Sequence, residues 1–312
     1  MQFTYRRQPV MALVYLKAVL KKRQKRYQLG DALPVIELQQ QPMAVKQQAL
    51  ARYRKLCNIP RSDQLPLLYP QIMAFPLQMA VLTARDFPLA VLGLVHVENE
   101  AQWMKPPVAA AGCVLAFKCK LGKLSNTAKG IHFAIETEAY DDDGLVWRST
   151  MTLLYRCKVG STMMPREAAG LTDSKETEID NKIETWLLKP AMARRYALLS
   201  RDLNPIHLFD ISAKLFSFKQ QIMHGMYVAA RSSAALMSDA DGGRCRIRHQ
   251  FKKPLMLPAK VKLFSVKQGS DSALPRLELW NKDVNQLHLV TEMLTADVVR
   301  APASEPNKIV TA

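Results

Sequence analysis

Residues 194–207 read RRYALLSRDLNPIH, and this short run combines turn-forming and titratable side chains. Pro205 lies between Asp202 and His207, so these two residues cannot share one continuous helix. Asn204 is a favourable N-cap, and Pro205 is a favourable first residue of a short helix. We therefore expect Asp202 on a loop and His207 in the first helical turn, with the carboxylate and the imidazole directed at one point.

A second motif, His224-Gly225-Met226, follows at the start of an apolar stretch that continues to Met237. Few charges and many alanines and methionines in this stretch predict a helix buried on most of its surface. Free backbone N–H groups at such a helix start favour developing negative charge. An acid/base pair beside an oxyanion donor is typical of a catalytic site, although Asp-x-Asn-Pro alone is also ordinary turn chemistry.

A weak internal repeat surrounds these motifs. Gln71-Ile72-Met73 matches Gln221-Ile222-Met223 at an offset of 150 positions (221 − 71), and each triplet opens a long apolar stretch. Upstream, residues 51–57 parallel residues 194–200, with a tyrosine at the same place in each. We therefore expect each half to contain a small helix and then a central helix.

Strand-like sequence follows the central helix in both halves. Residues 131–140 and 145–156 flank Asp141-Asp142-Asp143-Gly144, which predicts a hairpin turn, and residues 276–280 and 287–297 flank a second polar turn. Antiparallel strands curled around one helix give an α+β layer architecture.

The chain length of 312 residues suits two domains of about 150 residues each. Residues 158–180 are polar and show no sustained period, which predicts a linker. The expected organisation is a first domain over residues 1–157, this linker, and a second domain over residues 181–312.

The run from Tyr196 to His207 resembles the hydratase-2 motif of the MaoC-like dehydratases, and His224-Gly225-Met226 resembles that family's His-Gly-Met. The first half resembles the degenerate hotdog of two-hotdog members through Tyr69-Pro70, residues 74–77 and residues 93–97. The resemblance implies a double hotdog, in which two antiparallel sheets each wrap around a central helix and join as a pseudo-dimer. Residues 1–157 would be the degenerate hotdog with an N-terminal helical extension, and residues 181–312 the catalytic one.

The resemblance also implies roles for single residues. Asp202 and His207 would hold the catalytic water and shuttle its proton, Asn204 would position that water, and the Gly225 amide would hold the thioester oxygen. The implied reaction is the reversible hydration of trans-2-enoyl-CoA to (3R)-3-hydroxyacyl-CoA. It implies neither a metal nor a cofactor other than the coenzyme A that the substrate carries.

Arg201 departs from the pattern, because the family motif usually has glycine at this position. This puts the substrate fit or the rate in doubt, or else gives an acidic substrate a cation. Arg248, Lys252 and Lys253 surround Phe251 and are candidates for the phosphates of coenzyme A. The predicted substrate-binding residues are Arg201, His224, Met226, Arg248, Lys252 and Lys253.

The net charge of +17 predicts an acidic partner, either an acyl-CoA thioester or an acyl carrier protein. The basic run Lys21 to Arg26 is predicted to be a solvated helix face, and no RNP motif or zinc pattern indicates nucleic acid. Five cysteines without a CxxC pair favour a reduced, cytoplasmic protein without a zinc site. We expect a monomer with an internal pseudo-dimer, or a homodimer.

Residues 10–20 are apolar but too short to span a bilayer, and Lys17 interrupts them. Met11, Val14, Val19 and Leu20 are predicted to form one helix face that packs on the protein's own core. A helix lying on a membrane surface is the alternative.

Two other functions stay open at this point. Arg201 favours a non-catalytic, acyl-thioester-binding hotdog, and the charge of +17 equally suits a 3-hydroxyacyl-carrier-protein dehydratase.

The first half has no counterpart of the Asp202 motif. It is 7 positions shorter in this region (28 from Tyr196 to His224 against 21 from Tyr53 to Ala74), and Ala74-Phe75 take the places of His224-Gly225 in this alignment. One active site per chain is expected, with room for an acyl tail beside the first central helix.

Overall fold

The computed structural model describes residues 1–20, 34–91, 93–107, 112–127, 129–157, 178–237, 245–267 and 274–295. The strands are β1 (Gln2–Tyr5), β2 (Glu37–Ala44), β3 (Val95–Trp103), β4 (Val114–Thr127), β5 (Gly130–Asp141), β6 (Gly144–Tyr155), β7 (Glu178–Leu188), β8 (Arg246–Phe251), β9 (Ala259–Lys267), β10 (Arg276–Asn281) and β11 (Leu287–Leu294). The helices are α1 (Met11–Leu20), α2 (Gln47–Cys57), α3 (Tyr69–Leu82), α4 (Pro190–Ser200), the 3-10 helix η4 (Pro205–His207), α5 (Asp210–Lys214) and α6 (Gly225–Leu236).

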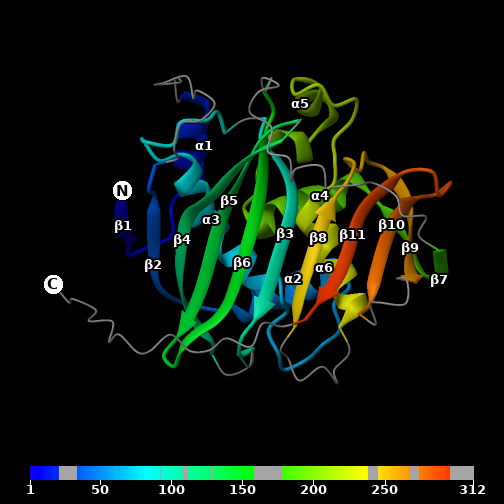
Figure 1. Ribbon diagram of the computed structural model, residues 1–312, viewed down its shortest axis with the longest axis horizontal. Helices are drawn as coiled ribbons and strands as arrows, with labels where there is room; N and C mark the ends of the chain where they lie inside the picture. Colours follow the sequence, from blue (N-terminus) through cyan, green and yellow to red (C-terminus); the bar gives the residue numbers. More distant parts are fainter. Residues whose placement is uncertain are drawn as a thin grey trace.

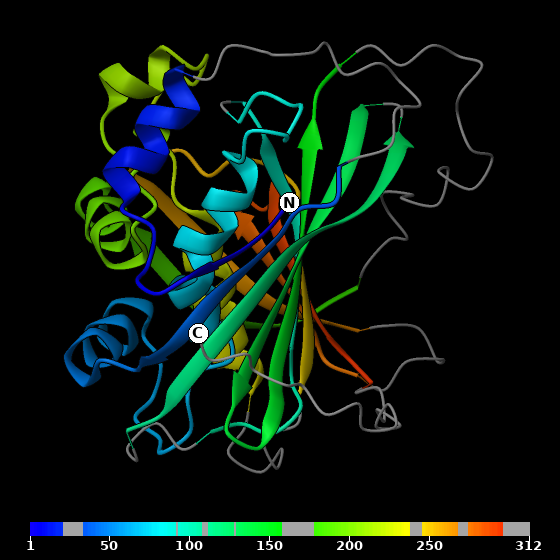
Figure 2. The same cartoon turned by 90° about the vertical axis from the view of Figure 1, so that its left-hand side faces the viewer.

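Within these ranges the strands form one 11-stranded sheet in the order β1-β2-β4-β5-β6-β3-β8-β11-β10-β9-β7. Every pair is antiparallel except β1 with β2, which run parallel. The helices gather on one face of this curved sheet (Figures 1 and 2). The other face of the sheet carries none of these helices in the two views.

The sheet repeats one design twice. Without β1, the first half has the order β2-β4-β5-β6-β3 and the second half has the order β7-β9-β10-β11-β8. In each half an edge strand leads to an 11-residue helix, α2 or α4, then to a central helix and four more strands. The predicted double hotdog is confirmed, with the two predicted sheets joined edge to edge into one.

The hairpin between β5 and β6 shows why the sequence folds as predicted. Side chains along β5 alternate between buried and half-buried positions, as expected for a strand with one face on the core. At the turn, the Asp141 carboxylate accepts the backbone N–H groups of Asp143 (2.9 Å) and Gly144 (3.2 Å). Gly144 has a φ of +126°, which favours glycine, so the predicted turn at residues 141–144 is confirmed.

Strands β3 and β8 form the seam between the two halves. Ala101 pairs with Ile247 there, and both side chains are almost completely buried. Next to them His249 lies beside the Asn99 carbonyl (3.3 Å) and the Ser233 hydroxyl of α6 (2.8 Å). Burial lowers the pKa of His249 to about 3, so its neutral ring connects the seam to the second central helix.

The two central helices correct the predicted alignment. Gln71-Ile72-Met73 lies inside α3, whereas Gln221-Ile222-Met223 precedes α6, so the matching triplets are not structurally equivalent. The N-cap residues are Leu68 and His224, which makes Leu68, not Ala74, the counterpart of His224. The connection between helices has 11 residues in the first half (58–68) and 24 in the second (201–224), a difference of 13 rather than 7.

The room for an acyl tail that was expected beside α3 is not found around Ala74 itself. Ala74 is 0% exposed, and Tyr69 and Met73 are also buried in the core. Ile72 and Phe75 of the same stretch are half-buried, so room for an acyl tail elsewhere beside α3 stays a prediction.

The N-terminal helix α1 packs on the core through Met11, Val14 and Ala18. This confirms the predicted core packing. The packed face differs from the predicted one, because Val19 is exposed and Ala18 is buried instead. None of the helices within the described ranges is long and apolar enough to cross a membrane. Of the five free cysteines, Cys57, Cys119 and Cys245 are buried, and Cys113 and Cys157 are half-buried.

Two sequence predictions fall largely outside the described ranges. The basic run Lys21 to Arg26 and residues 158–177 of the expected linker lie there. The last three residues assigned to the linker, 178–180, belong to β7. The division of the chain at residues 158–180 therefore stays a prediction.

The contact between β3 and β8 predicts how one substitution will change the stability of the protein. Ile247→Ala should lower the free energy of unfolding by about 2–5 kcal/mol, because it leaves a cavity where the two halves meet. Ile183→Ala, on the exposed part of β7, is the matched control and should change it by less than about 0.5 kcal/mol. Denaturant unfolding followed by circular dichroism measures both. Equal, small effects would show that the seam is not part of the cooperative core.

Candidate active site

The chain leaves α4 through a left-handed turn at Arg201. This residue has φ +63° and ψ 12°, a conformation that favours glycine and costs other residues roughly 1–2 kcal/mol. The Ser200 hydroxyl supports the turn, since it donates to the Tyr196 carbonyl (2.8 Å) and accepts the Asp202 N–H (3.3 Å). The left-handed φ at this position explains why the hydratase-2 motif usually has glycine here. In this chain Arg201 adopts that conformation and adds a charged side chain.

The next residues form the predicted capped turn. The Asn204 side chain accepts the Ile206 N–H (3.4 Å) as the N-cap of η4, and Pro205 is the first residue of that helix. The Asn204 N–H donates to Asp202 Oδ1 (3.3 Å). Asp202 therefore lies on the loop and His207 on the short helix, as the sequence predicts.

Asp202 faces two histidines with the same carboxylate oxygen. Its Oδ2 atom lies 3.9 Å from His207 Nε2 and 3.9 Å from His224 Nε2. The two imidazole rings stack with centroids 3.7 Å apart and planes 23° apart. A separation of 3.9 Å is too long for a direct hydrogen bond, but one water placed about 2.8 Å from both atoms would bridge Asp202 and His207.

His207 is held as a neutral base. Its Nδ1 donates to the Ile222 carbonyl (2.9 Å), so in the neutral ring the unprotonated nitrogen is Nε2, which faces Asp202. Burial lowers the pKa of His207, and the opposing attraction of Asp202 is the smaller effect. His207 therefore has a free lone pair at neutral pH, which a general base requires.

Asp202 and His207 form the candidate catalytic dyad, and His224 holds Asp202 in position beside His207. Its Nε2–H donates to the Asp202 backbone carbonyl (3.1 Å), and its ring contacts Tyr196 at a centroid distance of 5.0 Å. Burial first, and His207 second, lower the pKa of His224 to about 3, so it stays neutral. Sequence analysis placed His224 among the substrate-binding residues, whereas the structure gives it contacts that fix the position of Asp202.

Asp202, His207 and His224 are also the kinds of residue that bind transition metals, and their ligand atoms lie within 4.8 Å of one another. His224 fits this role poorly, because the nitrogen that faces Asp202 needs its proton to donate to the carbonyl. The donor set therefore suits proton transfer better than metal binding, and the expected absence of a metal stays a prediction.

Gly225 begins α6, where the first backbone N–H groups have no intrahelical partner. A Cβ atom at Gly225 would lie 2.8 Å from Cε1 of Phe251, so only glycine lets this ring approach the helix start. The next residue, Met226, is half-buried against the core. Gly225 directly follows His224, whose ring lies beside Asp202, and its role as an amide donor to the thioester oxygen stays a prediction.

The N-terminal segment contributes a residue that sequence analysis missed. The Tyr15 hydroxyl of α1 donates to Asp202 Oδ1 (3.1 Å), across 187 positions of sequence. No motif surrounds Tyr15, and the apolar run in which it lies predicts core packing or, as the alternative, a helix on a membrane surface. Only the three-dimensional structure could reveal this contact.

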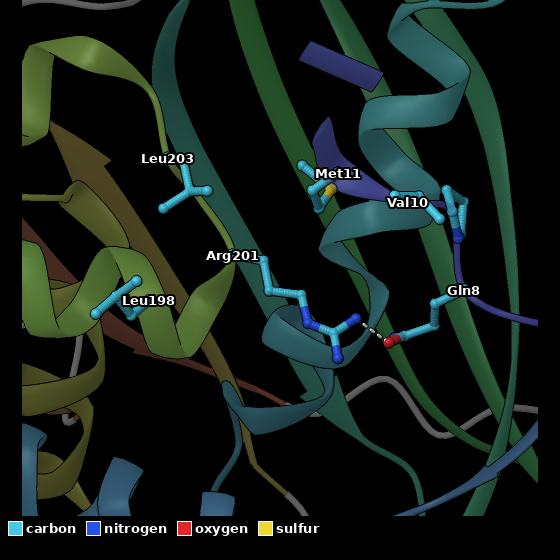
Figure 3. A pocket seen from close by; sticks show the side chains of 7 residues that line it. Gln8, Val10, Met11, Leu198, Arg201 and Leu203 are labelled. Atoms are coloured by element: carbon cyan, nitrogen blue, oxygen red, sulfur yellow. Dashed lines mark hydrogen bonds between the residues drawn. The ribbon is translucent and has the colours of Figure 1, made fainter. Parts of the chain in front are cut away.

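The same segment forms one wall of a cavity of about 310 Å³. Figure 3 shows Arg201 reaching across it to a hydrogen bond with Gln8, with Leu203 on the side of the motif. Arg201 and Leu203 are the neighbours of Asp202 in the chain, whereas Asp202 and His207 do not line the cavity themselves. It is lined by Gln8, Pro9, Val10, Met11, Leu198, Arg201 and Leu203.

The three predicted phosphate contacts differ in their surroundings. Arg248 faces Glu100 (3.4 Å) and Glu98 (4.0 Å) of β3, so its charge is already compensated at the seam. Lys252 and Lys253 are exposed and directly follow Phe251, which contacts the start of α6. Of the three, only these two lysines remain suitable cations at the edge of the site.

Comparisons with known proteins support the fold. Residues 170–278 match the MaoC like domain. The 3-hydroxyacyl-thioester dehydratase X of Mycobacterium tuberculosis is 28% identical over 235 residues, which cover 75% of this chain and 81% of that protein. Residues 170–278 therefore form a MaoC like domain, and the chain as a whole is similar to this dehydratase.

Solved structures support the fold. A crystal structure of HtdX from Mycobacterium tuberculosis has 24% identity and a TM-score of 0.66, covering 83% of this chain and 99% of that one. A MaoC-like dehydratase from Phytophthora capsici has 20% identity and a TM-score of 0.69, covering 85% and 97%. Both cover nearly the whole double hotdog rather than one half of it.

Gly225 provides a test of the site geometry. Gly225→Ala should reduce turnover about 10²-fold or more, because the new methyl group displaces Phe251 or the helix start and so misplaces the amide donor. Steady-state kinetics with the thioester substrate measure this, and thermal unfolding checks that the variant folds.

Phe251→Leu in the Gly225→Ala background should restore part of the activity by making room for the methyl group. A single variant as active as the wild type would show that the start of α6 takes no part in the reaction.

Proposed function

We propose that this chain is a hydro-lyase that interconverts a trans-2-enoyl thioester and water with a (3R)-3-hydroxyacyl thioester. The observation that carries the proposal is the water-sized separation of 3.9 Å between Asp202 Oδ2 and His207 Nε2, beside the N-terminus of α6. The relative from Mycobacterium tuberculosis is named a 3-hydroxyacyl-thioester dehydratase, which agrees with this reaction type.

In the hydration direction, His207 Nε2 takes one proton from the bound water while the water oxygen forms a bond to C3 of the substrate. The electron pair of the C2=C3 double bond moves toward the thioester carbonyl, whose oxygen becomes negative. The Gly225 N–H at the start of α6 would donate to that oxygen. The proton is then delivered to C2, so that H and OH have been added across the double bond.

Asp202 orients the water and stabilises the imidazolium that His207 becomes during transfer. Asn204 supports this by donating its N–H to the Asp202 carboxylate (3.3 Å). Dehydration uses the same groups in reverse. The reaction as proposed needs no cofactor beyond the coenzyme A or carrier arm of the substrate.

The cavity lined by Gln8, Arg201 and Leu203 suits a thioester substrate that carries an apolar chain and an acidic group. Its lining is mostly apolar, with one guanidinium group at the motif. Lys252 and Lys253 at the edge of the site would contact the phosphates. We propose coenzyme A as the carrier, and a carrier-protein substrate is the outcome that would replace it.

The dyad is tested by substitutions of nearly constant volume. Asp202→Asn and His207→Gln should each reduce hydration of a short trans-2-enoyl-CoA by about 10²–10⁴-fold, because each removes a proton-carrying or water-orienting group. Loss of the enoyl-thioester absorbance measures the rate, with coenzyme A and carrier-protein thioesters compared in parallel.

Asp283→Asn, in an exposed turn, and His132→Gln, on β5, are the matched controls and should retain wild-type rates. Near-wild-type turnover in either variant would show that Asp202 and His207 are not the catalytic pair. Thioester binding without turnover by the wild-type protein would instead support a non-catalytic binding protein.

Arg201→Gly tests whether the cation serves binding or chemistry. Its backbone is already left-handed, so glycine fits the turn, and the expected change is a rise in KM of about 5-fold with kcat nearly unchanged. Arg61→Gly, in an exposed loop, is the control for the loss of one positive charge. A large fall in kcat at constant KM would show instead that Arg201 acts in the transition state.

A further inference from the structure

We propose that Tyr15 is a positioning residue of this active site, whose hydroxyl group holds the Asp202 carboxylate so that Oδ2 faces the two histidines. The helix α1, which lies outside the repeated hotdog units, would then be a working part of the site. The kinetic part of this inference rests on the proposed function, whereas its geometric part does not.

The hydrogen bonds to Asp202 divide its two oxygens between two tasks. Oδ1 accepts the Tyr15 hydroxyl (3.1 Å) and the Asn204 N–H (3.3 Å). Oδ2 is left to face Nε2 of His207 and of His224 at 3.9 Å each. Without Tyr15, Oδ1 would keep only the longer bond to a backbone group of its own loop, and the half-buried carboxylate could rotate.

The position of the Tyr15 hydroxyl is set by packing rather than by this hydrogen bond. Met11, Val14 and Ala18 bury the inner face of α1, so the helix is anchored on both sides of Tyr15. The segment before the helix is also tied down, because the Gln8 side chain donates to the Met73 carbonyl of α3 (2.7 Å) and accepts from Arg201. A donor fixed in this way can orient a carboxylate on a loop.

Tyr15 also remains a donor over the working pH range. Burial first, and the negative charge of Asp202 second, raise the pKa of Tyr15. The hydroxyl therefore keeps its proton and donates it to Oδ1. A protonated phenol beside a carboxylate favours one orientation of that carboxylate without supplying a competing negative charge.

The contact joins the two halves of the molecule at the reacting group. Tyr15 comes from the N-terminal extension and Asp202 from the MaoC-like half. The same extension provides Gln8, Val10 and Met11 to the cavity that Arg201 and Leu203, the chain neighbours of Asp202, also line. One segment therefore both borders the space for the substrate and fixes the carboxylate that acts on the water.

Tyr15→Phe isolates the hydroxyl, because it keeps the ring and therefore the packing. We expect kcat to fall about 10-fold to 100-fold while KM stays within about 2-fold, since the substitution misplaces a reacting group without altering the cavity wall. A merely structural role would lower thermal stability and leave kcat unchanged.

Tyr140→Phe is the matched control. The Tyr140 hydroxyl also donates to a carboxylate, Glu138 Oε2 (2.7 Å), but on β5 in the first half. Its kinetic constants should equal those of the wild type.

A second readout does not depend on activity. The chain has six histidines, so the imidazole ¹⁵N spectrum is sparse. Tyr15→Phe should shift the signals of His207 and His224, which face Asp202, and Tyr140→Phe should leave them in place. A Tyr15→Phe variant with wild-type kcat and unshifted imidazole signals would overturn the inference. Inactivity of the wild-type protein on every thioester would overturn the proposed function alone, and the imidazole spectra would still decide the role of Tyr15.

Discussion

The pairing of β3 with β8 is the interaction on which the rest of the structure depends. It turns two five-stranded units and one added strand into a continuous sheet, and it brings Ala101 and Ile247 together at the buried seam. His249 extends this contact to Ser233 on α6, so the second central helix is fixed relative to the first half. Because α6 carries Gly225 at its start, the location of the amide donor follows from the register of the seam.

Burial, more than charge, sets the chemistry at the motif. Asp202 attracts a proton to His207 and His224, yet both histidines have lowered pKa values because desolvation is the larger effect. The outcome is a pair of neutral rings beside a carboxylate. A protonated His207 would form an ion pair with Asp202 and would have no lone pair to accept a proton from the water. Burial of His207 is therefore what allows it to act as a base at neutral pH.

The sequence predicted the features that local rules govern. Pro205 and Asn204 fixed the capped turn, and the alternation along β5 with its Asp-Gly turn fixed a hairpin, because each depends on neighbours in the chain. The correspondence between helices was misaligned because a repeated Gln-Ile-Met triplet outweighed the helix starts at Leu68 and His224. Tyr15 was missed because its partner lies 187 positions away, and no local pattern encodes that distance.

The contact between the N-terminal extension and Asp202 has a consequence for how this site responds to dilution. Where two separate chains must associate to complete a site, the fraction of complete sites depends on the protein concentration. Here the chain carries Tyr15 and Asp202 in one covalent unit, so their encounter is intramolecular and has a constant effective concentration. The geometry of the carboxylate is therefore independent of how much protein is present, and each copy of the chain holds a complete set of these groups.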